Sequence, residues 1–99
     1  MSKYPWKIVF DTKDLPQEAG LYLIDSLTED NHEFINTLYV GQTINFYNRI
    51  HCDKKHPFWR ATRGRAKDEV IVVNYLTLAA LEESLIKELS PMLNVVHNG

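Results

Sequence analysis

A run of β-branched and aromatic residues, Val70–Leu76, constrains the fold of this chain most strongly. Such side chains pack well on a pleated surface, so the run predicts a well-buried strand. Thr77 follows directly and can cap a helix, which we expect to end near Ser90 because Pro91 disfavours helical geometry in the residue before it. The sequence therefore predicts a strand followed at once by a helix.

Periodicity and chain breakers indicate the remaining elements. Three further strands are expected at residues 6–11, 20–25 and 37–41. A polar stretch between the last two, residues 26–33, suits a long hairpin loop, and Asn45 can cap a helix from Phe46 to about Cys52. We expect an α+β fold in which a small, mostly antiparallel sheet of three to four strands is covered by helices.

Size and composition limit the class of protein. The chain has 99 residues, 44% of them apolar, which suits one compact domain over residues 1–99 that buries about two-thirds of its unfolded surface. Cys52 is the only cysteine, which excludes an internal disulfide and a cysteine-based zinc site. We find no charged leader and no apolar stretch of membrane-spanning length, so we expect a soluble, cytoplasmic protein without a membrane partner.

The charge is unevenly distributed along the chain. Residues 49–67 contain seven basic residues and one acidic residue, so the segment carries 7 − 1 = +6, whereas the rest of the chain carries −2 − 6 = −8. A local positive potential can hold a phosphate backbone although the whole protein is acidic. The alternative is an ordinary solvated loop, because Lys and Arg are mostly exposed.

Glu82 has an unusual place in the helix predicted after Thr77. At 100° per residue, Leu81, Leu85 and Leu89 cluster on one side, and Glu82 projects into that apolar stripe, whereas Glu83 points to the polar side. A carboxylate among leucines is costly unless a cation or donor compensates it. Either a metal ion or an internal salt bridge, for example to Arg49, would do so.

Two tripeptides, Gly20-Leu21-Tyr22 and Tyr39-Val40-Gly41, lie on neighbouring predicted strands. Arg49 follows in the next predicted helix, Glu82 in the later one, and Pro91-Met92-Leu93-Asn94 comes after it. In this order the residues resemble the GIY-YIG nuclease family over residues 20–94. The resemblance implies a GIY-YIG nuclease-like fold and a divalent-metal-dependent DNA endonuclease.

The resemblance also implies roles for individual residues. Tyr22 would be the general base in the in-line attack of water, Tyr39 would orient groups, and Arg49 would stabilise phosphoryl charge. Glu82 would hold one Mg²⁺ or Mn²⁺, and Asn94 would order the site by hydrogen bonding. The product would carry a 5′ phosphate. An unperturbed tyrosine titrates near pH 10, so Tyr22 needs activation. Without the motif context, both tyrosines would be ordinary packing residues.

The chain departs from the family pattern at two positions. Relatives often carry a histidine four residues after the arginine, where this chain has Asp53, so His51 or His56 would have to assist. Relatives also often carry lysine after the second tripeptide, where this chain has Gln42. Gly41 would admit a phosphate or the following helix.

DNA contacts are expected from two sources, the end of the second tripeptide and the basic segment. The residues concerned are Gly41, Gln42, Lys54, Lys55, Arg60, Arg63 and Arg65. Cleavage modules of this kind usually take their specificity from attached domains, so a specificity-giving partner protein fits this class. Two other functions stay open, a noncatalytic DNA-binding module and a protein-interaction domain that acts on a nuclease partner.

Overall fold

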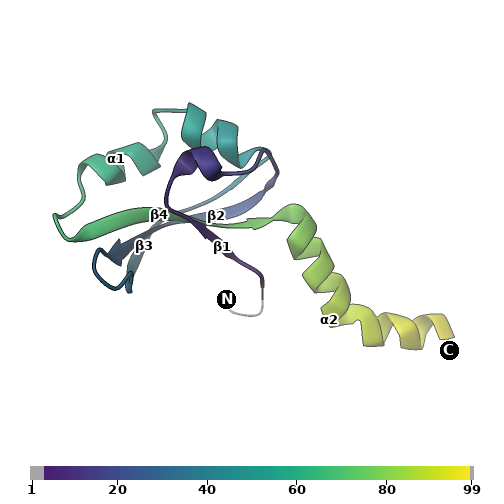
Figure 1. The fold of residues 1–99 in the computed structure, drawn as a ribbon. Coiled ribbons are helices and arrows are strands. Elements are labelled where there is room, and N and C mark those ends of the chain that lie inside the picture. The colour runs from purple at the N-terminus through teal and green to yellow at the C-terminus, as the bar shows by residue number, and fades with distance from the viewer. Residues whose placement is uncertain (1–3, 99) are drawn as a thin grey trace.

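The computed structural model describes the backbone of residues 4–98 and the side chains of residues 4–88. Figure 1 shows three short helices, η1 (Thr12–Asp14), η2 (Tyr47–Cys52) and α1 (Pro57–Arg63), on one side of the sheet. The last helix, α2 (Leu78–Asn98), extends away from the sheet. None of the helices in the described part is long and apolar enough to cross a membrane. The elements follow in the order β1 (Lys7–Val9), η1 (Thr12–Asp14), β2 (Gly20–Thr28), β3 (Phe34–Thr43), η2 (Tyr47–Cys52), α1 (Pro57–Arg63), β4 (Glu69–Thr77) and α2 (Leu78–Asn98).

The four strands form one antiparallel sheet in the order β1-β4-β2-β3. This confirms the predicted α+β class and the small antiparallel sheet. β4 lies between β1 and β2, and its residues Val72 and Val73 are fully buried, as its β-branched composition predicts. The sheet therefore has the predicted strand at its centre.

The hairpin between β2 and β3 is tighter than predicted. β2 continues to Thr28, so the long loop predicted over residues 26–33 is wrong in its first half. Ser26 is buried, and its hydroxyl donates to Asn36 Oδ1 at 2.7 Å. Because a partner on β3 satisfies the hydroxyl, a polar residue is tolerated inside the strand.

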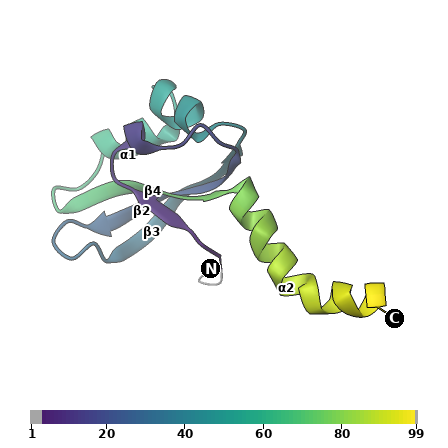
Figure 2. The same ribbon diagram turned by 45° about the vertical axis from the view of Figure 1, so that its right-hand side comes forward.

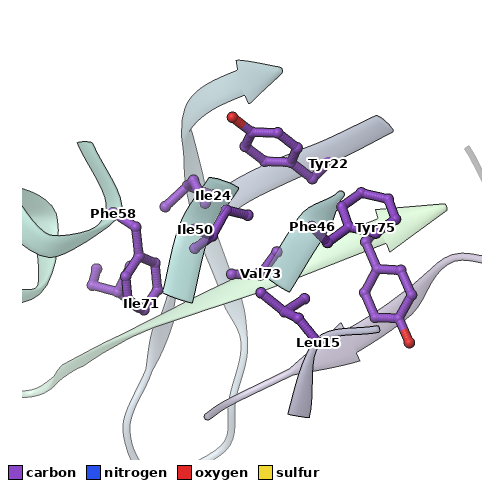
Figure 3. Packing of buried hydrophobic residues seen from close by; sticks show 9 residues of the cluster. All are labelled: Leu15, Tyr22, Ile24, Phe46, Ile50, Phe58, Ile71, Val73 and Tyr75. Carbon is purple, nitrogen blue, oxygen red and sulfur yellow. The ribbon is translucent and has the colours of Figure 1, made fainter. Parts of the chain in front are cut away.

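The hydrophobic core fills the space between one face of the sheet and the three short helices above it (Figures 1 and 3). Alternation along β2 directs Tyr22 and Ile24 to this face. Figure 3 shows the phenol of Tyr22 at the edge of the cluster, with its hydroxyl directed away from the other side chains. The cluster comprises Leu15, Tyr22, Ile24, Phe46, Ile50, Phe58, Ile71, Val73 and Tyr75.

The segment after β3 contains two short helices, one predicted and one missed. Asn45 Oδ1 accepts from the backbone N–H of Asn48 at 2.9 Å, which confirms Asn45 as the cap of the predicted helix, a π-helical turn named η2. α1 is not predicted, although Pro57 at its first position is a known start signal. The imidazole of His56 caps α1 by accepting from the N–H of Phe58 at 3.0 Å.

α2 begins as predicted but does not end as predicted. Thr77 Oγ1 accepts from the N–H of Ala80 at 3.1 Å, which confirms the cap. The helix then continues past Pro91 to Asn98, so the predicted end near Ser90 is wrong. Figures 1 and 2 show that it projects from the end of the sheet and changes direction along its length, as expected for a helix with an internal proline.

Candidate tyrosine-histidine site

The two tyrosines of the tripeptides converge on the helix-covered face of the sheet. Their rings are stacked, with centroids 6.0 Å apart and planes 25° from parallel. Tyr22 is opposite Gly41 in the strand register, and a Cβ on Gly41 would lie 2.5 Å from Tyr22 Cζ. The close approach predicted at Gly41 therefore occurs, but the group that approaches is the Tyr22 phenol rather than a phosphate or helix.

His56 is the direct partner of Tyr22. Its Nε2 lies 2.7 Å from the Tyr22 hydroxyl, and its ring lies 5.3 Å from that of Tyr39. Because Nδ1 accepts from the N–H of Phe58, a neutral imidazole carries its proton on Nε2 and donates it to the Tyr22 oxygen. The phenolic proton of Tyr22 can then be donated to the Tyr39 hydroxyl or to another group, such as a water or a phosphate.

Arg49 and Asp53 form the charged side of the site. Arg49 Nη1 lies 2.7 Å from Asp53 Oδ2, an ion pair at i,i+4 spacing that is about two-fifths exposed. The other carboxylate oxygen of Asp53 accepts from the N–H of Lys55 at 3.0 Å. Asp53 thus fixes the arginine and also the turn that leads to His56.

Burial and charge shift the two central groups in opposite directions. Burial raises the pKa of Tyr22 to about 12, a shift that Tyr39 reinforces and the positive charge of Arg49 opposes. Burial also lowers the pKa of His56 to about 4, helped by Arg49 and opposed by Asp53. At neutral pH both groups are therefore uncharged, and the activation of Tyr22 that a general base needs is absent in the protein alone.

The second tentative histidine lies elsewhere. His51 Nδ1 is 2.8 Å from the hydroxyl of Thr12, and its ring stacks near Tyr47 with centroids 4.9 Å apart. Among the described side chains, it contacts Thr12, Tyr47 and Trp59, but neither Tyr22 nor Tyr39. Of the two histidines, the structure brings only His56 to the tyrosines.

A groove leads from Tyr39 along α1. It has a volume of about 380 Å³, and its walls include Arg60 and Arg65. Lys55 and Arg63 are exposed, and the exposed Lys54 lies with its ammonium 3.9 Å from the centre of the Trp59 ring. The predicted basic segment therefore borders the tyrosines on one side of the molecule, with its charges in solvent.

Glu82 is not buried, and this prediction is wrong. Its side chain is exposed on α2, as are Leu85 at 39% and Ile86 at 62%. A helical stripe predicts which side chains share a face, but here little of the protein covers that face beyond the first turns. No hydrogen bond or ion pair from Glu82 to the tyrosines occurs among the described side chains.

Two further predicted residues lie apart from the site. Gln42 is opposite Leu21 in the register, so both point away from Tyr22, and they line a hollow with Leu78 and Leu81. Asn94 lies in the backbone of α2, but its side chain is outside the described residues.

The described side chains do not assemble a metal centre. Among residues 4–88 no group of three or more His, Cys, Asp and Glu side chains could hold an ion. Asp53, whose charge acts on His56, is already paired with Arg49. The donor set at the tyrosines therefore does not fit a divalent ion without a further carboxylate.

Asp53 is the site residue that sequence reasoning missed. It was a departure from the family pattern, yet its spacing from Arg49 is the signal for a helical ion pair. His56 takes the place beside Tyr22 although it is seven residues from Arg49. The turn before α1 thus places His56 beside Tyr22.

The comparisons leave the family open. No family model, curated protein or solved structure matches the sequence. The resemblance to GIY-YIG nucleases therefore stays a prediction that rests on the order of the motif residues.

Proposed function

We propose that the protein is a DNA endonuclease that hydrolyses phosphodiester bonds and leaves a 5′ phosphate. The observation that carries this proposal is the convergence of Tyr22, His56 and Arg49 beside a groove whose walls include Arg60 and Arg65. A planar guanidinium suits a phosphoryl group, and the exposed cations suit the DNA backbone.

The proposed chemistry uses the chain's own groups at stated atoms. Tyr22 as phenolate accepts a proton from the attacking water, and the Nε2–H of His56 and the charge of Arg49 stabilise the phenolate. The water oxygen bonds to phosphorus, the bond from phosphorus to the 3′ oxygen breaks, and the 3′ oxygen takes a proton from solvent. Asp53 keeps Arg49 in position until a phosphate competes for the guanidinium. Tyr39 restricts the Tyr22 ring by stacking on it.

The expected requirement for Mg²⁺ or Mn²⁺ follows only from the resemblance to the GIY-YIG nucleases. The described donors do not assemble a site for the ion at the tyrosines, so the proposed steps use protein groups alone. Glu82 as its ligand is a separate proposal, which needs α2 to approach the tyrosines.

Cleavage assays with a matched pair of variants test the proposal. The purified protein is incubated with supercoiled, linear, branched and single-stranded DNA, with and without Mg²⁺ or Mn²⁺. Tyr22→Phe should lower the single-turnover cleavage rate by roughly 100-fold or more. Tyr47→Phe is the control, since its phenol lies against His51 instead. Equal rates in Tyr22→Phe and the parent would remove Tyr22 from the mechanism.

The pH dependence of the rate tests the protonation state. With a pKa of about 12 for Tyr22, the phenolate fraction rises about tenfold per pH unit in the neutral range, and the rate should follow it. A flat profile would mean that Tyr22 acts as a neutral hydrogen-bond donor and not as the base.

A noncatalytic DNA-binding module is the second candidate. The raised pKa of Tyr22 and the exposure of Glu82 favour it. It predicts salt-dependent DNA binding without cleavage of any DNA form under either metal ion.

A further inference from the structure

The sheet face opposite the tyrosines contains a hollow of about 580 Å³, which is in the size range of ligand sites. Alternation along β2 directs Leu23 and Asp25 to this face, whereas Tyr22 and Ile24 point to the helices. We name it the Asp25 hollow. The walls that matter for the argument are Tyr4, Trp6, Asp25, Phe34 and Asn74.

Asp25 is a buried carboxylate with neutral partners. It is 4% exposed, and its two oxygens accept from Thr37 Oγ1 at 2.7 Å and from Asn74 Nδ2 at 2.5 Å. Among the side chains of residues 4–88, no basic group forms an ion pair with it. Burial of an uncompensated charge is costly, so a cation that reaches Asp25 would be stabilised.

The walls of the hollow are aromatic. Tyr4, Trp6 and Phe34 line it, and Phe34 is 63% exposed. Aromatic faces attract cations, most strongly where water is partly excluded. The buried indole N–H of Trp6 has no hydrogen-bond partner among the described residues, and a peptide carbonyl is the acceptor that would satisfy it. A ligand with a cation and a carbonyl oxygen matches both groups.

The charged residues around the hollow also favour a cationic ligand. Among the described side chains, no Lys or Arg lines the hollow, and Asp25 is the one carboxylate in its walls. The basic helix α1 lies on the other side of the sheet (Figure 1). The basic side chains of α1 therefore lie away from the hollow, and the Asp25 carboxylate makes the hollow attractive to cations.

We propose that the Asp25 hollow binds an arginine side chain presented by a peptide segment of a partner protein. A guanidinium matches a carboxylate in plane, stacks on aromatic rings and is less strongly hydrated than an ammonium. The peptide backbone supplies the carbonyl for Trp6. This proposal does not depend on nuclease activity, because it uses the opposite face.

A titration with two isosteric peptides tests it. The ¹⁵N-labelled protein is titrated with capped Gly-Arg-Gly and with the same peptide carrying the neutral isostere citrulline, and amide and indole resonances are followed. The arginine peptide should shift the Trp6 indole and Asn74 side-chain signals. The citrulline peptide should bind at least about fivefold more weakly. Equal binding of both peptides, or no shift at millimolar peptide, would overturn the proposal.

Variants localise the binding. Phe34→Ala should weaken the affinity for the arginine peptide by about threefold, and Asp25→Asn should weaken it by more. Ile44→Ala is the control and should leave the affinity unchanged, since Ile44 is 89% exposed and lies outside the hollow. If Asp25→Asn does not fold, Phe34→Ala decides. Unchanged affinity in Phe34→Ala would overturn the site. Shifts that grow with protein concentration and vanish on dilution, without peptide, would mean that a second copy is the occupant and would also overturn it.

Discussion

The segment from η2 to α1 and the first half of α2 both follow a strand of the sheet, and both carry predicted catalytic residues, but they differ in how they are held. Ile50 and Phe58 bury the first segment in the core, with 0% and 4% exposure. In α2, Leu85 is 39% exposed and Ile86 is 62% exposed. Only the first segment brings its functional side chains, Arg49 and His56, to the tyrosines.

The difference teaches that an anchored element, and not a motif position alone, gives a side chain its chemistry. Catalytic groups need to be held within a fraction of an ångström by packing and hydrogen bonds, as His56 is. The molecule has a radius of gyration of 16.4 Å and a longest dimension of 59 Å, whereas a compact domain of this size has about 13 Å. α2 is the element that makes it elongated (Figure 1).

Neutralisation of Glu82 tests whether α2 belongs to the site, and it has the largest expected effect. If α2 docks near the tyrosines in the complex with DNA, Glu82→Gln abolishes metal-dependent cleavage, and Glu83→Gln changes little. Single-turnover assays with Mg²⁺ or Mn²⁺ measure both. Normal cleavage by Glu82→Gln would show that Glu82 is not the metal ligand. α2 would then lie outside the site, as it does in the protein alone.

Gly41→Ala tests how tightly Tyr22 is packed in the core that also holds the η2–α1 segment. The new methyl group would lie 2.5 Å from the buried Tyr22 ring, so the free energy of unfolding should fall by about 2–3 kcal/mol. Gly64→Ala is the control, because its methyl group would meet only the Arg60 carbonyl oxygen at an ordinary 3.4 Å. Denaturant unfolding measures both, and equal losses would contradict the close packing of Tyr22.

The buried imidazole of His56 makes the stability of the protein depend on pH. The pKa of His56 falls from 6.5 to about 4 on folding, so between these values the unfolded chain binds more protons than the folded protein. Stability should therefore fall by about 2 kcal/mol between pH 7 and pH 5.

The same unfolding experiment on two histidine variants checks this origin. His56→Gln should lose the pH dependence, whereas His51→Gln should keep it, since His51 lies against Thr12 instead. A pH dependence that survives in His56→Gln would assign the effect to other groups.

The smallest expected effect concerns the exposed charges of the basic segment. Lys54→Ala with Lys55→Ala should weaken binding to all DNA sequences about equally and reduce the slope of log affinity against log salt by about 1.8, or 0.9 per contact. Substitution of Glu29, Asp30 and Glu33 by Gln is the control and should leave the slope unchanged. The same slope for the lysine variant and the parent would make the segment a solvated loop.

The sequence predicts the sheet and the starts of two helices well, because these depend on local signals. β-branched runs and the caps Asn45 and Thr77 act within a few residues. The convergence of Tyr22 and Tyr39 also follows from strand alternation. Burial of α2 cannot be predicted this way, since a helical stripe does not tell what covers it.

The choice between His51 and His56 shows the same limit. Both lie in the basic segment close to Arg49, and only the turn after Asp53 and the start of α1 decide which imidazole meets Tyr22. That turn depends on tertiary contacts such as the burial of Phe58.

The packing of Tyr22 across Gly41 makes residues in two different strands share one volume. A side chain larger than hydrogen at position 41 fits without displacing the Tyr22 ring only if position 22 becomes smaller. Gly20 is similarly restricted, because a Cβ there would meet the carbonyl oxygen of Leu76 and the Phe46 ring. In a library randomised at positions 22 and 41, selection for folding should therefore enrich compensating pairs, and tyrosine at 22 should be found most often together with glycine at 41.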